Sequence, residues 1–251
     1  MPTLVAVIPH PDDESYSFGG TIALAVRSGW RAVVLCLSAG EGGERHDRPP
    51  SAPRSTAVTR LEELARSCSI LGAVPLHWRL PDGGFARAPG QSSKLARLFT
   101  ELGPSLVLAL GADGAYGHPD HLATHRWVLR AWHSMRDPRP ALLLSAFPPG
   151  LFLPQYQKCA DGGLLGSPPS LAPGDIGASA PHYSVAIRPV RETKLAAIAA
   201  HRSQLPGGDP ETLFPPGVVR ALLDSECFVD ARGYRDKATA ALLTGFEASA
   251  G

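Results

Sequence analysis

Two short clusters of histidine and carboxylate side chains carry the chemistry of this sequence. The first is His10–Glu14, with the sequence HPDDE, and the second is Tyr116–His121, with the sequence YGHPDH. Each cluster contains a proline that stiffens a turn, and together they offer imidazole and carboxylate groups as metal ligands, with acid and base groups left over. That composition is typical of a hydrolytic zinc site.

The first cluster comes directly after a short apolar run, Leu4–Ile8, that predicts a β-strand. His10, Asp12 and Asp13 should then lie at the carboxyl edge of a sheet, where open α/β sheets bind ligands. Two adjacent aspartates cannot point the same way from an extended backbone, so we assign Asp13 to the metal and Asp12 to the role of general base. Acids also charge and cap the first turn of many helices, but the His-Pro pair at a strand end favours the functional interpretation.

The second cluster leaves its choice of ligands open. It follows a predicted strand and the loop Gly111–Gly117, so it should reach the same edge of the sheet as the first cluster. With a proline in the first helical turn, His118 and His121 share one helix face. His125 lies four residues beyond His121 on that face, so spacing alone does not exclude a His121–His125 pair. Asp120 could hydrogen-bond an imidazole and fix its tautomer.

The elements that must position these clusters alternate between strands and helices, which is typical of a parallel sheet with crossover helices. The predicted strands are Leu4–Ile8, Arg31–Ser38, Val74–Leu80, Leu106–Leu110 and Ala141–Ala146. The predicted helices are Ser15–Arg27, Ser55–Leu71, Ser92–Leu102 and His118–His133, with Ser55 and Ser92 as N-caps. We therefore expect an α/β fold with a mostly parallel sheet, helices on both faces, and the site at the carboxyl edge of the strands.

Two stretches break this alternation. Gly40–Pro53 and Phe147–Pro181 are rich in Gly and Pro and lack clear periodicity, so both are predicted to be long loops. Loops of that length in a compact domain usually serve as lids or binding loops. A last predicted strand, Tyr183–Ile187, precedes a helix through Glu192–His201, and the segment from Val218 is expected to add a helix and a strand.

Length, charge and cysteine content narrow the class of protein. We expect one domain over residues 1–251, because a chain of this length can bury a full core. The net charge of +1, with Lys and Arg scattered, gives no electrostatic footprint for nucleic acid or an anionic membrane. The four cysteines are far apart, which argues against a thiolate metal site or a disulfide scaffold.

A soluble cytoplasmic protein that acts on a small polar molecule is therefore expected. No apolar stretch approaches the ~20 residues that a membrane helix needs, and the N-terminus lacks the pattern of a signal peptide. Homo-oligomerisation is left open by the sequence.

Taken together, the two clusters resemble the LmbE-like (PIG-L) zinc N-deacetylases, relatives of the N-acetylglucosaminyl-phosphatidylinositol deacetylase and of the mycothiol-pathway deacetylases. The resemblance implies a Rossmann-like fold and the removal of an N-acyl group, N-acetyl being the first expectation, from an amino sugar or glucosaminide by metal-activated water. It also implies that His10, Asp13 and His121 bind zinc and that Asp12 is the general base.

The same resemblance gives roles to the rest of the second cluster. His118 would protonate the leaving amine and steady the oxyanion, and Asp120 would orient His118. Tyr116, two residues before His118, would assist. His125 becomes a supporting or structural residue on this basis.

Lesser similarities to the family extend over nearly the whole chain. They lie at Gly40–Glu44, at Arg60 with Glu63, at Pro81–Gly84 and at His201–Gln204. By similarity, Glu44, Arg60 and Asp82 would line the sugar-binding end of the pocket. Phe147–Pro181 follows no family pattern and should help to shape the pocket mouth, so the specificity for acyl group and aglycone does not follow from the resemblance.

Alternatives to this interpretation stay open. Imidazole and carboxylate ligands also accept iron, cobalt or manganese in place of zinc. An amidase that cleaves a thiol-sugar conjugate would use the same site, and a non-catalytic sugar-binding module would be expected to lack Asp12 or His118, which are both present. A dinucleotide-binding enzyme would need a Gly-x-Gly-x-x-Gly turn after the first strand, and the first cluster occupies that turn instead.

Overall fold

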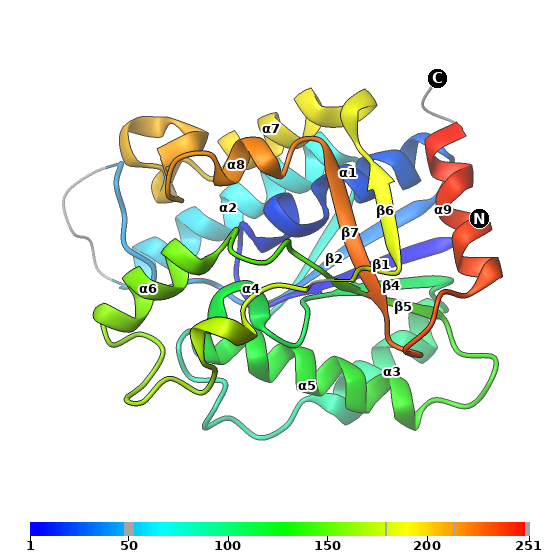
Figure 1. Cartoon of the computed structure of the whole chain (residues 1–251), viewed down its shortest axis with the longest axis horizontal. Coiled ribbons are helices and arrows are strands. Elements are labelled where there is room, and N and C mark those ends of the chain that lie inside the picture. Colours follow the sequence, from blue (N-terminus) through cyan, green and yellow to red (C-terminus); the bar gives the residue numbers. More distant parts are fainter. Residues whose placement is uncertain (48–52, 179, 213, 249–251) are drawn as a thin grey trace.

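Seven strands within the described part of the chain form one sheet (Figure 1). The structure is a computed structural model that describes residues 1–47, 53–178, 180–212 and 214–248. The strands are β1 Thr3–Ile8, β2 Arg31–Ser38, β3 Val74–Leu80, β4 Leu106–Ala109, β5 Ala141–Ser145, β6 Tyr183–Ala186 and β7 Ser225–Asp230. The helices are α1 Asp13–Arg27, α2 Pro53–Leu71, α3 Ser92–Leu102, α4 Gly114–Gly117, α5 Pro119–Ser134, α6 Leu153–Asp161, α7 Arg191–Ala199, α8 Val218–Ala221 and α9 Lys237–Ala248.

The order of the strands in the sheet is β3-β2-β1-β4-β5-β7-β6, and β1 to β5 pair in parallel. The expected mostly parallel α/β fold is therefore confirmed. The strand order reverses between β1 and β4, which is where doubly wound sheets bind ligands beyond the carboxyl ends of their strands. The two clusters follow these two strands, with His10 after β1 and His118 after β4 and the short α4.

Helices cover both faces of the sheet, as expected. Leu4, Ala6 and Ile8 of β1 contribute to one core, and Val5 and Val7 contribute to the other. The helices α1, α2, α7 and α9 add side chains to the first core, and α3 and α5 add them to the second (Figure 1). A parallel strand that is buried on both faces requires a continuous apolar run rather than alternation, which explains the sequence of β1.

The helix starts differ most from the predictions. α1 begins two residues earlier than expected, at Asp13, and α2 also begins two residues earlier, at Pro53, which puts Ser55 inside the helix. The prediction that Ser92 caps a helix is wrong, because Ser92 is the first residue of α3 and Gln91 takes the cap position without a side-chain hydrogen bond. The strands β4, β5 and β6 each end one residue earlier than predicted, and α7 ends at Ala199.

Phe147–Pro181 contains a helix that we did not predict. α6 buries Tyr156 and Cys159, which are three residues apart, in a small core with Phe152 and Leu165. Two buried positions in so short a helix give a weak periodic signal, so the Pro and Gly content dominated the prediction. Of the other predicted loop, residues 40–47 are irregular as expected, and residues 48–52 lie outside the described residues.

The C-terminal segment holds the expected helix and strand, as α8 and β7, and then a further helix, α9. β7 runs antiparallel between β5 and β6, a pairing that the sequence did not indicate. No helix in the described ranges is both long enough and apolar enough to cross a bilayer.

Candidate active site

The loop between β1 and α1 sends its two aspartates in different directions. Asp12 has a φ of 119° and a ψ of −31°, a region that L residues rarely adopt. Such a conformation costs on the order of 1–3 kcal/mol. The side chains of Asp12 and Asp13 therefore diverge, as expected. The cause is the left-handed conformation of Asp12 at the start of α1 rather than an extended backbone. Asp13 faces His10 and His121, and Asp12 faces Arg60.

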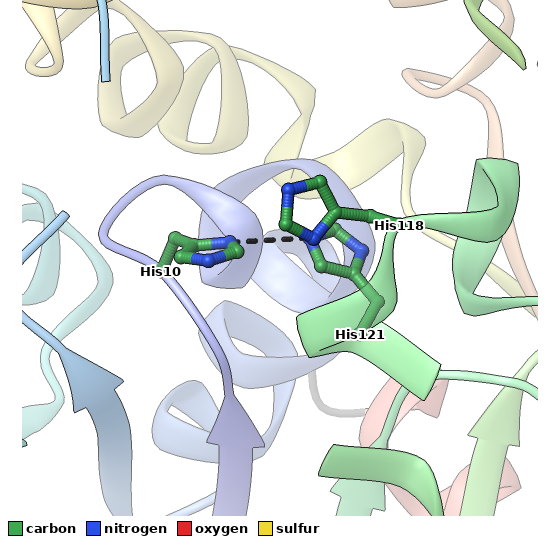
Figure 2. A group of neighbouring side chains, drawn as sticks. All are labelled: His10, His118 and His121. Atoms are coloured by element: carbon green, nitrogen blue, oxygen red, sulfur yellow. Dashed lines mark hydrogen bonds between the residues drawn. The ribbon is translucent and has the colours of Figure 1, made fainter. Parts of the chain in front are cut away.

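Three of the predicted metal ligands bring their donor atoms together. His10 Nδ1 lies 3.2 Å from His121 Nε2, and Asp13 Oδ2 lies 3.5 Å from the first and 3.6 Å from the second. Ligand atoms held at about 2.1 Å from a tetrahedral zinc ion lie about 3.4 Å apart. The triangle therefore fits such an ion. Figure 2 shows the rings of His10 and His121 facing each other, with His118 beside them.

The outer ring nitrogens of both histidines are also engaged. His10 Nε2 lies 3.0 Å from Asp82 Oδ1 and 3.4 Å from Asp120 Oδ2. His121 Nδ1 lies 3.0 Å from the carbonyl oxygen of Gly114, so it donates there and leaves Nε2 as the free lone pair. Such partners fix ring orientation and tautomer in metal sites. Besides the triangle of His10, Asp13 and His121, two other groups of possible ligand atoms occur among the described residues. One is His10, Asp82 and Asp120, and the other is His10, His118 and His121.

The charges within this cluster shift its pKa values strongly. Burial lowers the pKa of His10, but hydrogen bonds with Asp120, Asp13 and Asp82 outweigh it and raise that pKa well above its ordinary value. Burial raises the pKa of Asp13, yet His121 and His10 bring it down to about 2. A carboxylate that stays ionised in this way suits a metal ligand.

His125 does not join the donor triangle. Its Nδ1 lies 2.9 Å from the carbonyl oxygen of Leu110, so the ring is bonded to the end of β4. The alternative of a His121–His125 ligand pair, which spacing left open, therefore has no support in the structure. His121 alone of the two faces Asp13.

Asp120 has a different partner from the one that the resemblance implied. Its carboxylate accepts hydrogen bonds from the backbone N–H groups of Gly83 (2.8 Å) and Phe85 (3.0 Å) and contacts His10, while only its backbone N–H donates to Nδ1 of His118 (3.2 Å). The expectation that its side chain orients His118 is wrong. The loop after β3, which sequence spacing could not place, brings the two N–H groups that hold this carboxylate.

His118 caps α5 through that same bond. Burial, together with His121 and His10, lowers the pKa of His118 to about 2 in the metal-free protein. The ring is therefore neutral, with Nδ1 as an acceptor and Nε2 carrying the proton. Tyr116 packs its ring against His121 at 5.2 Å between centroids, and burial raises the pKa of its hydroxyl.

Asp12 is held by Arg60. The guanidinium donates to Asp12 Oδ2 (3.1 Å) and to the carbonyl oxygens of Pro11 (2.6 Å) and Gly40 (3.0 Å). Burial raises the pKa of Asp12 to about 7, although Arg60 opposes the shift. Arg60 was predicted to bind substrate, and most of its donors are taken by the protein itself. Asp82 is likewise engaged, with His10 and with the N–H of Gly42 (2.9 Å).

A cavity of about 390 Å³ opens onto these groups. His10, Asp12, Asp13, Tyr116 and His118 line it, as do the predicted sugar-binding residues Glu44, Arg60 and Asp82. The sequence did not predict the other residues that line the cavity. They include Tyr16, Phe214, Leu164 and three residues of α6, Gln155, Lys158 and Cys159. The i, i+3, i+4 spacing of those three on one helix face is the signal that could have found them.

Comparisons with known proteins identify relatives of this chain. The family model described as GlcNAc-PI de-N-acetylase (PIG-L) matches residues 5–132, slightly more than half of the 251 residues. A 1D-myo-inositol 2-acetamido-2-deoxy-alpha-D-glucopyranoside deacetylase of Nakamurella multipartita is 32% identical over 81% of this chain and 81% of its own length.

Solved structures share the fold at lower identity. The N,N'-diacetylchitobiose deacetylase of Pyrococcus horikoshii superposes with a TM-score of 0.62 at 20% identity, covering 91% of this chain and 83% of its own. The 4-carboxy-2-hydroxymuconate hydratase of Pseudomonas putida gives a TM-score of 0.68, also at 20% identity, over 92% of this chain and 96% of its own. Because one fold serves a deacetylase and a hydratase, the reaction has to be argued from the site. On the family match and the 32% identity, this chain belongs to the PIG-L (LmbE-like) family of GlcNAc-PI de-N-acetylases.

Proposed function

We propose that this chain is a metal-dependent N-deacetylase that removes the acetyl group from an N-acetylglucosamine unit of a small glycoconjugate. The observation that carries the proposal is the 3.2–3.6 Å spacing of the donor atoms of His10, Asp13 and His121, in a cavity that also holds the carboxylate of Asp12. The Nakamurella relative, a 2-acetamido-2-deoxy-glucopyranoside deacetylase, supports a glucosaminide as the substrate.

His10, Asp13 and His121 would hold the metal. Zinc is the first candidate, and iron or cobalt would suit the same donors. When bound, such an ion supplies Lewis acidity to the amide carbonyl and to a water molecule. Three protein ligands leave positions open for both, which is the arrangement of a catalytic rather than a structural site.

Asp12 is the proposed general base and takes a proton from the attacking water. Its pKa of about 7 in the metal-free protein suits a group that must accept a proton near neutral pH. Arg60 binds one oxygen, Oδ2, and fixes the direction of the other. A bound cation would lower this pKa, which would keep Asp12 ionised before the reaction.

His118 would steady the oxyanion that develops as water adds to the amide carbon. Its Nδ1 is engaged by the N–H of Asp120, so Nε2 is the atom left to face the substrate. The proton that Asp12 takes from the water balances the one that the leaving nitrogen receives. Its delivery through His118 requires the ring to become protonated on the way, and the negative charge that develops beside the ring favours that state. Tyr116 is proposed to assist at the same oxygen, because it lines the cavity next to this ring.

The sugar is proposed to bind between Glu44 and the loop that carries Asp82. Glu44 is exposed at the cavity and its carboxylate can accept hydrogen bonds from sugar hydroxyls. Arg60 and Asp82 are committed largely to Asp12 and His10, so their proposed contribution is to shape this end of the pocket. The wall formed by α6 then faces the aglycone or the acyl group.

We further propose that the chain works as a single domain in the cytoplasm. All four cysteines lie in the described ranges and are free thiols, which supports a reducing compartment.

The test is a panel of N-acyl glucosaminides varied at the acyl group and at the anomeric substituent, with metal content measured on the same sample. Release of acetate and a free amine by protein that contains about one metal ion per chain is expected. Asp12→Asn should retain the metal and lose most turnover, whereas His121→Ala should lose the metal. Wild-type speed in Asp12→Asn would refute the assigned base, and a metal-loaded protein that is inert on the whole panel would refute the proposed activity.

A further inference from the structure

The peptide group that precedes the strained Asp12 is held by hydrogen bonds at both its carbonyl oxygen and its N–H. The peptide that joins Pro11 to Asp12 has its carbonyl oxygen bound by Arg60 (2.6 Å) and its N–H bound by Oε2 of Glu14 (3.0 Å). The next carbonyl oxygen, that of Asp12 itself, accepts from Ser15 N–H (3.0 Å) at the start of α1. Because φ and ψ of Asp12 together set the orientation of these two peptide groups relative to each other, holding both of them fixes Asp12 in its left-handed conformation.

Glu14 is itself anchored at its other oxygen. Oε1 accepts a hydrogen bond from Ser67 Oγ (2.5 Å) and lies 2.7 Å from Nε2 of His201. All three side chains are fully buried, at 0% exposure. A carboxylate without water needs such partners, and these come from α2 and from the turn after α7. Neither the proposed metal site nor the proposed proton transfers use Glu14 or His201.

We propose that Glu14, anchored by His201 and Ser67, is a positioning residue that holds Asp12 in the conformation in which its carboxylate can act as the base. The proposal rests on the proposed function, since it takes Asp12 as the base. Without the hydrogen bond to Glu14, the peptide group before Asp12 can rotate, which relieves the strain of the left-handed conformation of Asp12. The carboxylate of Asp12 then leaves its place, while the substrate pocket stays intact.

The chain offers a matched control in Glu63. This residue is on α2 and is buried, at 2% exposure, like Glu14. Its two oxygens accept the N–H and the hydroxyl of Ser203, both at 2.7 Å, in the same turn that carries His201. Glu63→Leu therefore removes a buried carboxylate that links the same two parts of the protein, but it leaves the hydrogen bonds of the peptide group before Asp12 in place.

The test compares Glu14→Leu with Glu63→Leu by steady-state kinetics, metal content, thermal unfolding and crystallography. Leucine removes both carboxylate oxygens, whereas glutamine would keep an acceptor for the N–H of Asp12. Glu14→Leu should lower kcat by about tenfold or more, the usual range for partners that orient a functional group, with KM and metal content unchanged and with Asp12 relaxed to a negative φ. Glu63→Leu should lower the unfolding temperature comparably and keep kcat within about twofold. An unchanged kcat in Glu14→Leu, an equal loss of kcat in both variants, or an unchanged left-handed φ at Asp12 would each overturn the proposal.

A second pair of variants keeps the test decisive if Glu14→Leu does not fold. His201→Gln retains an N–H donor that can reach Glu14, whereas His201→Leu does not, so the first should keep most of the kcat that the second loses. Equal kcat in the two would overturn the proposal. The crystallographic readout of Asp12 needs no turnover, so a failure of the proposed deacetylation, seen as an inert wild type, is distinguishable from a failure of this inference.

Discussion

Removing one partner of the buried ion pair between Lys194 and Glu226 should strongly destabilise the protein. Lys194 Nζ lies 2.6 Å from Glu226 Oε1 and donates to the carbonyl oxygen of Tyr16 (2.8 Å), and both side chains are at most 3% exposed. Glu226 also accepts from the backbone N–H groups of Gly20 and Thr21, each at 2.8 Å. The pair therefore connects α7 and β7 to the middle of α1.

Lys194→Met retains the volume of the side chain and leaves the Glu226 carboxylate buried without its cation. Breaking a buried pair in this way costs about 3–5 kcal/mol. We expect the lower part of that range, about 3 kcal/mol, because Glu226 keeps two backbone donors. For a chain of this size that loss corresponds to a decrease in unfolding temperature of about 6–12 °C.

Urea or thermal unfolding of the metal-loaded protein measures this loss. Arg188→Met is the control, since Arg188 pairs with Asp224 at 3.3 Å but is 74% exposed, and such surface pairs contribute under about 1 kcal/mol. Burial lowers the pKa of Lys194 despite the attraction of Glu226, so the intact pair adds little net stability. The double variant Lys194→Met/Glu226→Gln should therefore lose less stability than the sum of the losses in the two single variants. A loss below 1 kcal/mol in Lys194→Met would refute the reasoning.

The remaining predictions concern packing, pH dependence and metal binding. Gly20→Ala would place a Cβ atom 2.5 Å from Ile187 and should lower the free energy of unfolding by about 1–3 kcal/mol. Gly245→Ala is the control in urea titrations, because its Cβ would meet no atom within 4 Å and the variant should not be destabilised. Backbone hydrogen bonds in the first turn of α9 lower the pKa of Asp236. The wild type should therefore be more stable than Asp236→Asn, with the full difference above about pH 4. The difference should disappear as the pH falls through the depressed pKa, and unfolding curves at several pH values measure it. Chelation should lower the unfolding temperature of the metal-loaded protein, and His125→Gln should keep the full metal content, measured by elemental analysis.

The parts of this site that are local in sequence could be predicted. β1 is a continuous apolar run because both its faces are buried, and the cluster that follows it has to emerge at the carboxyl edge of the sheet. The same holds for His118 and His121 after β4. Spacing did not separate His121 from His125, because both lie on one helix face, and the choice of His121 came from the resemblance. In the structure Nδ1 of His121 contacts the carbonyl oxygen of Gly114 and Nδ1 of His125 contacts that of Leu110, which gives the two rings different partners.

The partners that depend on distant loops could not be predicted. The carboxylate of Asp120 contacts His10 rather than His118 because the loop after β3 brings the N–H groups of Gly83 and Phe85 to it. Arg60 and Asp82 were assigned to the sugar by similarity, and the structure gives them protein partners that the sequence did not indicate, Asp12 and His10. Each of these outcomes is decided by which opposite charge or open hydrogen bond is closest in space, and spacing along the chain does not contain that information.

The metal and proton-transfer residues proposed here all lie within residues 5–132, the stretch that matches the family model. Several groups that hold them, including Arg60, Asp82 and the backbone of Gly114, also lie in that stretch. Others come from outside it, because Lys194 and Glu226 bind the middle of α1, and His201 anchors Glu14 beside the base. The helix α6, which forms one wall of the cavity, also lies beyond residue 132. The C-terminal half therefore supports a site whose ligands it does not supply, so substitutions at His201 or on the α6 wall should alter kcat or substrate preference while metal binding persists.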